Sequence, residues 1–187
     1  MLNDNENRVE TIRKKINDIL NGITDENYRH TFYVHLYGVA SFAALLASRR
    51  GLDMELAYVA GLMHDVSLLT NPDEYENHCA NSAQTAGEIL AGTGLFTEGE
   101  INIVTNAILY HNDTENTHSP YDEILKDADI LQPFFNDIPE PAWQPAKSRL
   151  EKILTELNIP LGIINKMEYR YANNATFVIF AKTSSMR

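Results

Sequence analysis

Apolar residues recur at helical spacing along most of the chain. In segment 9–20, VETIRKKINDIL, they stand at positions 9, 12, 16, 19 and 20, the stripe of an amphipathic helix. Asn21 and Gly22 follow as a stop signal. A second helix is expected over about 25–50, with Thr24 as its N-cap and a glycine at its end.

The same spacing predicts further helices and no strand pattern long enough for a sheet. The third is short and strongly apolar, capped by Asp53 and running to the His64-Asp65 pair. The others are expected over His78–Leu90, Thr97–His111, 120 to about 135 with an interruption near Pro133, Lys147–Leu157, and Leu161 to about Lys182, where TFVIFAK is β-favouring. The predicted fold class is all-α, in a single domain.

Composition and charge narrow the classes of partner. With 15 Lys and Arg against 26 Asp and Glu, the formal charge is -11, which argues against a nucleic acid polymer or an anionic membrane as partner. A small phosphorylated substrate would need a cation or a local basic pocket to offset that field. The start, MLNDNENRVE, has no apolar targeting region, and no run of about 18 apolar residues occurs. We therefore expect a cytoplasmic protein, and a homodimer stays open.

The helix lengths bring distant histidines together. From His35 up to Gly51 is about 16 residues and from Asp53 back to His64 about 11, roughly 24 Å against 16 Å at 1.5 Å per residue. An antiparallel hairpin therefore carries His64 to within about two turns of His35. By the same argument, a second hairpin brings His111 back to His78.

The His64-Asp65 pair ends an otherwise apolar stretch, YVAGLMHDVSLL, where burial of an unpaired charge is costly. Adjacent helical residues do not share a face, so the two bind one ion only if the helix ends there. A later segment, LKDADIL, offers Asp127 and Asp129, which lie nearly on opposite faces of a helix. The apolar residues around them slightly favour Asp129 as the inward one.

Two histidines with two aspartates form a donor set for a divalent cation. Imidazole nitrogen and carboxylate oxygen suit Mn, Fe, Co, Ni, Zn or Mg, with positions left for water and substrate. Such an ion lowers the pKa of a bound water and offsets phosphoryl charge, which favours hydrolysis of a phosphate ester. The single cysteine, Cys79, excludes an intramolecular disulfide and is expected to be a small core residue. His30 and His118 are expected to have surface or packing roles.

The order His35, His64-Asp65 and a distant Asp resembles the HD superfamily of metal-dependent phosphohydrolases. The matching blocks are HLYGVASFAALLA, AGLMHD and LKDADIL, and the family pattern aligns the final Asp with Asp129. The resemblance covers about 28–135 and implies an HD-type helical bundle. It leaves 1–27 as a helix packing on this core and 136–187 as a helical extension.

The resemblance is greatest to HD members with extra histidines between the dyad and the last Asp. There it implies that His78 and His111 contact phosphate or hold a second ion, so that one or two ions are expected. ADILQP, at 128–133, also resembles HD-type hydrolases of symmetrical dinucleoside tetraphosphates. One departure is Leu68, where several relatives have a charged or polar residue; Ser67, Lys126 or His111 are candidates to replace it as acid-base group or substrate contact.

We expect, then, a metal-dependent phosphohydrolase acting on a nucleotide or other small phosphate ester. His35, His64, Asp65 and Asp129 would hold the ion, and Asp65 and His111 would take part in catalysis. The alternative is a nucleotide-sensing or regulatory module that keeps the metal without turnover, which Leu68 motivates. A helical interaction protein with incidental histidines is the third.

Overall fold

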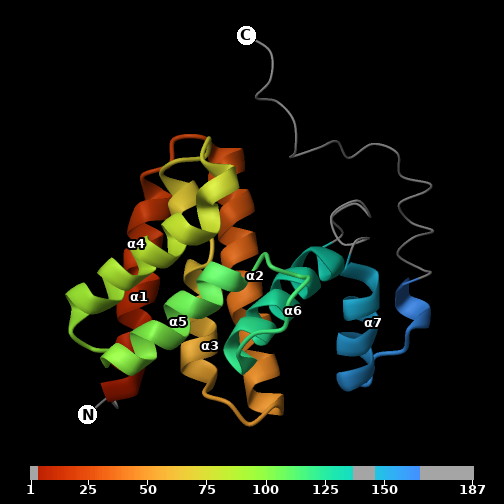
Figure 1. Ribbon diagram of the computed structural model, residues 1–187. Helices are drawn as coiled ribbons and strands as arrows, with labels where there is room; N and C mark the ends of the chain where they lie inside the picture. The colour runs from red at the N-terminus through yellow and green to blue at the C-terminus, as the bar shows by residue number, and fades with distance from the viewer. Residues whose placement is uncertain (1–3, 137–145, 165–187) are drawn as a thin grey trace. The chain divides into compact units, whose positions relative to one another are not determined.

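The computed structural model describes residues 4–136 and 146–164, and in these residues it is helical. The elements are α1 (Asp4–Asn21), α2 (Glu26–Arg49), α3 (Met54–Met63), the short 3₁₀ turns η1 (Val66–Leu69) and η2 (Tyr75–Asn77), α4 (His78–Thr93), α5 (Glu98–Tyr110), α6 (Pro120–Phe135) and α7 (Lys147–Glu156). Figure 1 shows their order along the chain. The all-α prediction is confirmed. Two compact units are separated, Met1–Gln132 and Pro133–Arg187.

Side chains at the helix ends fix where the helices begin. Asp53 caps α3, accepting from the backbone of the next turn, as predicted. Thr97 and Glu100 form a reciprocal capping box at the start of α5. The N-cap of α2 is Asp25, whose carboxylate accepts from the amides of residues 27 and 28; the prediction of Thr24 was one residue early.

The helix ends follow the glycine signals with one exception at a proline. Gly51 and Gly94 both have positive φ, 70° and 65°, which a side chain disfavours, and both lie just beyond a helix. The interruption expected near Pro133 is not observed, because α6 continues to Phe135. A proline in the last turn breaks only one hydrogen bond, which explains why the helix goes on.

The core of the first unit is built by the predicted apolar faces. Ile12 and Ile16 of α1 and the inner residues of α2 and α3 are fully buried. In α6 the apolar face expected from the sequence is buried as well: Ile124, Leu125, Ala128 and Leu131. Hydrophobic burial on this scale is what holds α2, α3 and α6 in fixed positions.

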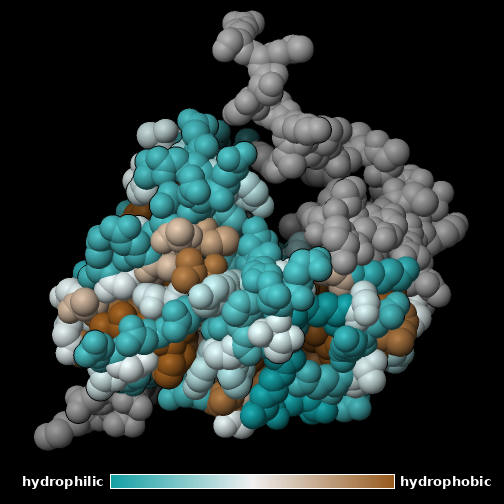
Figure 2. Space-filling model, in the orientation of Figure 1, coloured by the Kyte–Doolittle hydropathy of each residue, from teal (hydrophilic) through white to brown (hydrophobic). Residues whose placement is uncertain are grey.

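By length and composition alone, α2 could cross a membrane. Core helices of soluble proteins pass the same test. Leu36, Val39 and Ala43 of this helix are fully buried in the protein. The face shown in Figure 2 is largely hydrophilic, with separate apolar patches.

The cytoplasmic location and the homodimer remain predictions. Trp143 and most of the helix expected from Leu161 onward lie outside the described residues.

Candidate metal centre

His35 and His64 meet at the open end of the hairpin formed by α2 and α3. Their Nε2 atoms are 3.1 Å apart, although the residues are 29 positions apart in sequence. His64 is fully buried, and the His35 side chain is 23 % exposed, so the pair opens to solvent on the His35 side. The hairpin therefore places the two imidazoles as helix lengths predict.

Two carboxylates join this pair. Asp65 Oδ2 lies 3.6 Å from His35 Nε2 and 3.4 Å from His64 Nε2. Asp129 Oδ1 lies 3.4 Å and 3.5 Å from the same two atoms. Asp65 reaches the side of His64 because α3 ends at Met63 and the Asp65 backbone, at φ -114°, has left the helix. The break expected at the dyad is what lets adjacent residues share one site.

A second pair of imidazoles lies on the other side of Asp65. His78 at the start of α4 and His111 at the end of α5 bring their Nε2 atoms to 3.3 Å. Asp65 Oδ1 is 3.5 Å from His78 Nε2 and 3.7 Å from His111 Nε2. This oxygen is buried and accepts no hydrogen bond in the described part of the chain. Asp65 thus turns one oxygen toward each histidine pair.

Nδ1, the second ring nitrogen of each of these four histidines, lies at hydrogen-bond distance from an oxygen. His64 Nδ1 donates to the carbonyl of Gly61 at 2.8 Å, His78 Nδ1 to that of Tyr75 at 2.6 Å, and His111 Nδ1 to that of Ile108 at 2.7 Å. His35 Nδ1 lies 2.8 Å from Oε1 of Gln132. A carbonyl oxygen only accepts, so each Nδ1 atom carries a proton and each Nε2 atom points inward, where its lone pair can bind a proton or a metal ion.

The four inward Nε2 atoms and the oxygens of Asp65 and Asp129 form a group of electron-pair donors that a cation would stabilise. Facing acceptors repel unless a proton or a metal ion lies between them, and a buried acceptor without a partner is costly. Nitrogen and oxygen donors within 4.8 Å of one another occur in overlapping groups here, among them His35, His64 and Asp129. Histidines braced through the second nitrogen are typical of metal ligands. The donor set fits a divalent ion.

The pKa directions agree with a pocket that attracts positive charge. Burial opposes charge on His64, but the carboxylates of Asp65 and Asp129 outweigh it and raise the His64 pKa well above its usual value. Burial raises the pKa of both aspartates, but the neighbouring histidines lower it by more. The pKa of Asp65 therefore lies well below its usual value, and that of Asp129 is lowered to about 2. Burial, followed by repulsion from His64, lowers the pKa of His111.

Asp127 and Asp129 have different surroundings, as their opposite positions on α6 require. Asp129 faces the histidines, whereas the buried Asp127 carboxylate pairs with Arg50 at the end of α2. Asp129 therefore belongs to one cluster, formed by His35, His64, Asp65, His78, His111 and Asp129. Asp127 instead joins α6 to α2.

Lys126 and Ser67, the predicted substrate contacts, bond elsewhere. The buried ammonium of Lys126 donates to the carbonyl of Asn116 and to Glu123, each at 2.8 Å, and lies 2.9 Å from His118 Nδ1. The Ser67 hydroxyl contacts the side chain of Ser82 and the carbonyl of His78. Of these partners only His78 belongs to the cluster, and Ser67 contacts its backbone carbonyl, not its imidazole. Their contacts favour structural roles.

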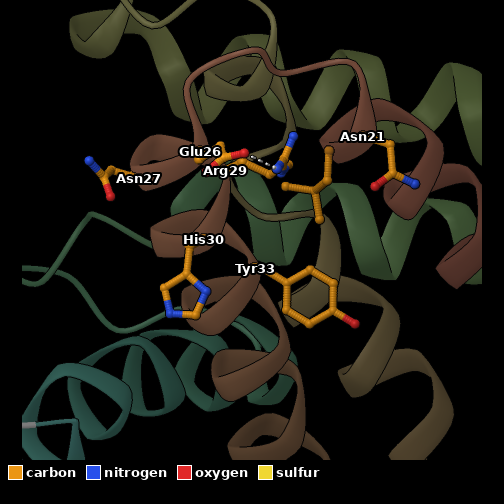
Figure 3. A pocket seen from close by; sticks show the side chains of 7 residues that line it. Asn21, Glu26, Asn27, Arg29, His30 and Tyr33 are labelled. Atoms are coloured by element: carbon orange, nitrogen blue, oxygen red, sulfur yellow. Dashed lines mark ion pairs between the residues drawn. The ribbon is translucent and has the colours of Figure 1, made fainter.

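His30 lies apart from these histidines. It is exposed and lines a surface hollow of about 450 Å³ between the end of α1 and the start of α2, with Tyr33 and the Glu26–Arg29 ion pair (Figure 3). His118 stacks on Tyr110 at 4.3 Å between ring centres. Both positions agree with the surface and packing roles expected from sequence.

The sequence did not single out two residues that contact histidines of the candidate site. Gln132 holds His35, and the ring of Tyr75, 63 % exposed, stacks on His78 at 4.8 Å between ring centres. A glutamine one turn after Asp129 and a tyrosine one turn before His78 were the available signals. Only the packed structure shows that both face the cluster.

Comparisons with known proteins address the family and the fold. A family model described as HD domain matches residues 32–133. A crystal structure of a predicted HD superfamily hydrolase from an uncultured Thermotogales bacterium superposes with a TM-score of 0.55 at 22% identity, covering 91% of this chain and 86% of that one. At this identity the superposition shows a shared helical fold.

Among curated proteins, the chain is similar to Ribonuclease Y from two bacteria. It is 29% identical over 105 residues to that of Thermus thermophilus and 30% identical over 105 residues to that of Petrotoga mobilis. Each match covers 56% of this chain, but only 17% and 19% of those proteins. The chain thus spans less than a fifth of the length of these relatives.

Proposed function

Because the chain belongs to the HD domain family, we propose that it is a metal-dependent phosphohydrolase acting on a nucleotide or another small phosphate ester. One observation carries the proposal. The inward Nε2 lone pairs of His35, His64, His78 and His111 converge with the oxygens of Asp65 and Asp129, and Asp65 Oδ1 is buried without a hydrogen bond in the described residues. A site of acceptors alone suits a cation better than an uncharged ligand.

His35, His64, Asp65 Oδ2 and Asp129 would hold one ion, and His78, His111 and Asp65 Oδ1 a second. Bound there, divalent ions polarise phosphoryl oxygens and lower the pKa of bound water. If a single ion is bound, His78 and His111 are free to contact the substrate phosphate.

The residues of this chain supply orientation and proton acceptance. The pKa of Asp65 is held well below its usual value, so the group is ionised at neutral pH and can accept a hydrogen bond that orients the attacking water. When no second ion occupies its Nε2, His111, whose pKa is lowered, is neutral at pH 7 and can accept a proton there. Leu68 is 4 % exposed, and its side chain supplies no polar group. Its backbone carbonyl accepts a hydrogen bond from the Tyr28 hydroxyl.

The charge of the chain favours a small substrate. A formal charge of -11 repels a polyanion at long range, whereas a mononucleotide brings few charges into the site.

A second candidate, cleavage of an RNA phosphodiester, is favoured by the similarity to proteins named Ribonuclease Y. The third, a sensing module without turnover, is favoured by the apolar Leu68.

The test combines metal analysis with a substrate panel. The purified chain, His64→Ala and the control His30→Ala are loaded with Mn, Co, Ni or Mg and assayed on nucleotides, simple phosphate esters and an RNA oligonucleotide. We expect bound metal and nucleotide turnover in the parent and in His30→Ala. His64→Ala should lose the ion shared with His35 and Asp129 and should show no turnover. No metal, together with equal activity in all three, overturns the proposal. RNA cleavage alone supports the second candidate; a nucleotide-dependent rise in Tm without product supports the third.

A further inference from the structure

A thiol lies beside the second histidine pair. Cys79 follows His78 in α4, and its Sγ is 3.5 Å from His78 Nε2. Cys79, His78 and His111 form a group in which Sγ and one ring nitrogen of each histidine all lie within 4.8 Å of one another. The sequence interpretation of Cys79 as a core residue does not account for this placement, and its side chain is only partly buried.

The spacing of these atoms is that of a tetrahedral metal site. With metal–nitrogen bonds of about 2.0–2.1 Å and a metal–sulfur bond of about 2.3 Å, tetrahedral angles put two nitrogens about 3.3 Å apart and a nitrogen about 3.5 Å from sulfur. The observed separations are 3.3 Å between His78 and His111 Nε2 and 3.5 Å between His78 Nε2 and Cys79 Sγ. Both separations are those expected for one ion bound by His78 together with His111 and Cys79.

A fourth ligand atom points to the same place independently. Asp65 Oδ1 is buried, accepts no hydrogen bond in the described residues, and lies 3.5 Å and 3.7 Å from the two Nε2 atoms. A carboxylate oxygen in that condition is stabilised by a cation. Asp65 Oδ1 and the thiol are thus both neighbours of the imidazole pair.

We propose that Cys79 binds the second ion through its sulfur, together with His78, His111 and Asp65 Oδ1. This inference rests on the proposed metal centre and adds to it a ligand and a choice of metal. On binding, the sulfur–metal bond forms and the thiol proton passes to solvent. A sulfur donor selects Zn, Co or Fe over Mn and Mg at this position, whereas His35, His64 and Asp129 offer only nitrogen and oxygen.

Cobalt(II) absorption tests the sulfur contact without any activity assay. A cobalt–thiolate bond gives a charge-transfer band in the near ultraviolet, and bound cobalt of any donor set gives weaker visible bands. Cys79 is the single cysteine of the chain, so the ultraviolet band has one source. We expect the band in the parent on Co(II) titration and its loss in Cys79→Ser and Cys79→Ala, both of which keep the visible bands of the first ion.

Competition and alkylation give a second readout. Cys79→Ser replaces a direct ligand, so it should bind its second Zn ion more weakly by at least the roughly tenfold seen when an outer partner of a ligand is lost, with little change for Mn. Zn should also slow alkylation of Cys79 by iodoacetamide in the parent, and His78→Ala should abolish that protection. Cobalt bound in the visible spectrum without an ultraviolet band overturns the sulfur ligand and leaves the metal centre standing. No bound cobalt at all overturns both.

Discussion

Gly61 of α3 lies directly against Ala40 of α2. A Cβ on Gly61 would be 2.6 Å from the Ala40 Cα and 2.8 Å from the Ala40 nitrogen. These are backbone atoms, so only separation of the two helices can relieve the clash. The hairpin that brings His35 to His64 depends on this close approach.

Gly61→Ala should therefore destabilise the protein by about 1–3 kcal/mol and weaken metal binding, because the Gly61 carbonyl also accepts from His64. Thermal unfolding and metal titration measure the two effects. Gly92→Ala is the control, since a Cβ there meets nothing within 4 Å, and it should leave Tm unchanged or slightly raised. Equal Tm values for the two variants would contradict the packing account.

Gln132 should act as a positioning residue for His35. Gln132→Leu removes the acceptor 2.8 Å from His35 Nδ1 and should lower metal affinity about 10- to 100-fold while the fold is retained. Gly38→Ala should have a milder effect in the same direction, because its Cβ would lie 2.7 Å from Cγ of Gln132. Calorimetric metal titration, with circular dichroism for the fold, measures this. Gln84→Leu, at an exposed position of α4, is the control and should change neither.

Asp129 and Asp127 should separate metal binding from stability. Asp129→Asn removes a charged donor beside His35 and His64 and should abolish binding of one ion with little loss of stability. Asp127→Asn breaks the ion pair with Arg50 and should cost about 1–3 kcal/mol, with metal content unchanged. Elemental analysis and urea unfolding distinguish them. Loss of metal in both variants, or in neither, would contradict the different orientations of the two side chains.

Lys126→Met should weaken the fold rather than substrate binding. Its ammonium is buried and donates to Asn116 and Glu123, so the variant leaves both acceptors without this donor. We expect a lower Tm and faster hydrogen exchange in residues 112–119, with unchanged metal content and KM for the substrate identified by the panel. A raised KM with unchanged Tm would instead restore the substrate role that the sequence suggested.

The capping box of α5 should make stability depend on pH. Hydrogen bonds from Thr97, with help from Arg8, outweigh burial and lower the pKa of Glu100 from 4.5. A lowered pKa means that this stabilisation is present above pH 4.5 and is lost as pH falls through the folded value. The Tm difference between the parent and Glu100→Gln should therefore be present at pH 7 and shrink below about pH 4. A constant difference would exclude a charge effect.

The fold and the convergence of the cluster could be predicted because they depend on local rules. Helix periodicity and a rise of about 1.5 Å per residue bring His64 to within about two turns of His35. The opposite positions of residues 127 and 129 on a helix separate the two aspartates. The prediction of Thr24 as N-cap failed because Asp25, its neighbour, caps equally well by type.

The roles of Gln132, Tyr75 and Lys126 were out of reach of the sequence for a different reason. Each depends on which side chain of a neighbouring element it meets, and helix spacing alone does not fix that. In the sequence, Lys126 was a candidate substrate contact because Leu68 leaves a polar group to be replaced. Only packing shows that it turns toward the 112–119 loop.

Three of the four imidazoles are aimed by main-chain carbonyls, and only His35 is aimed by a side chain. Amino-acid replacement cannot delete a carbonyl, so changes at positions 61, 75 and 108 affect these acceptors only where they move the backbone, as expected for Gly61→Ala. Position 132 has no such protection. A single codon change there removes the acceptor, so the orientation of His35 can be retuned through one side chain.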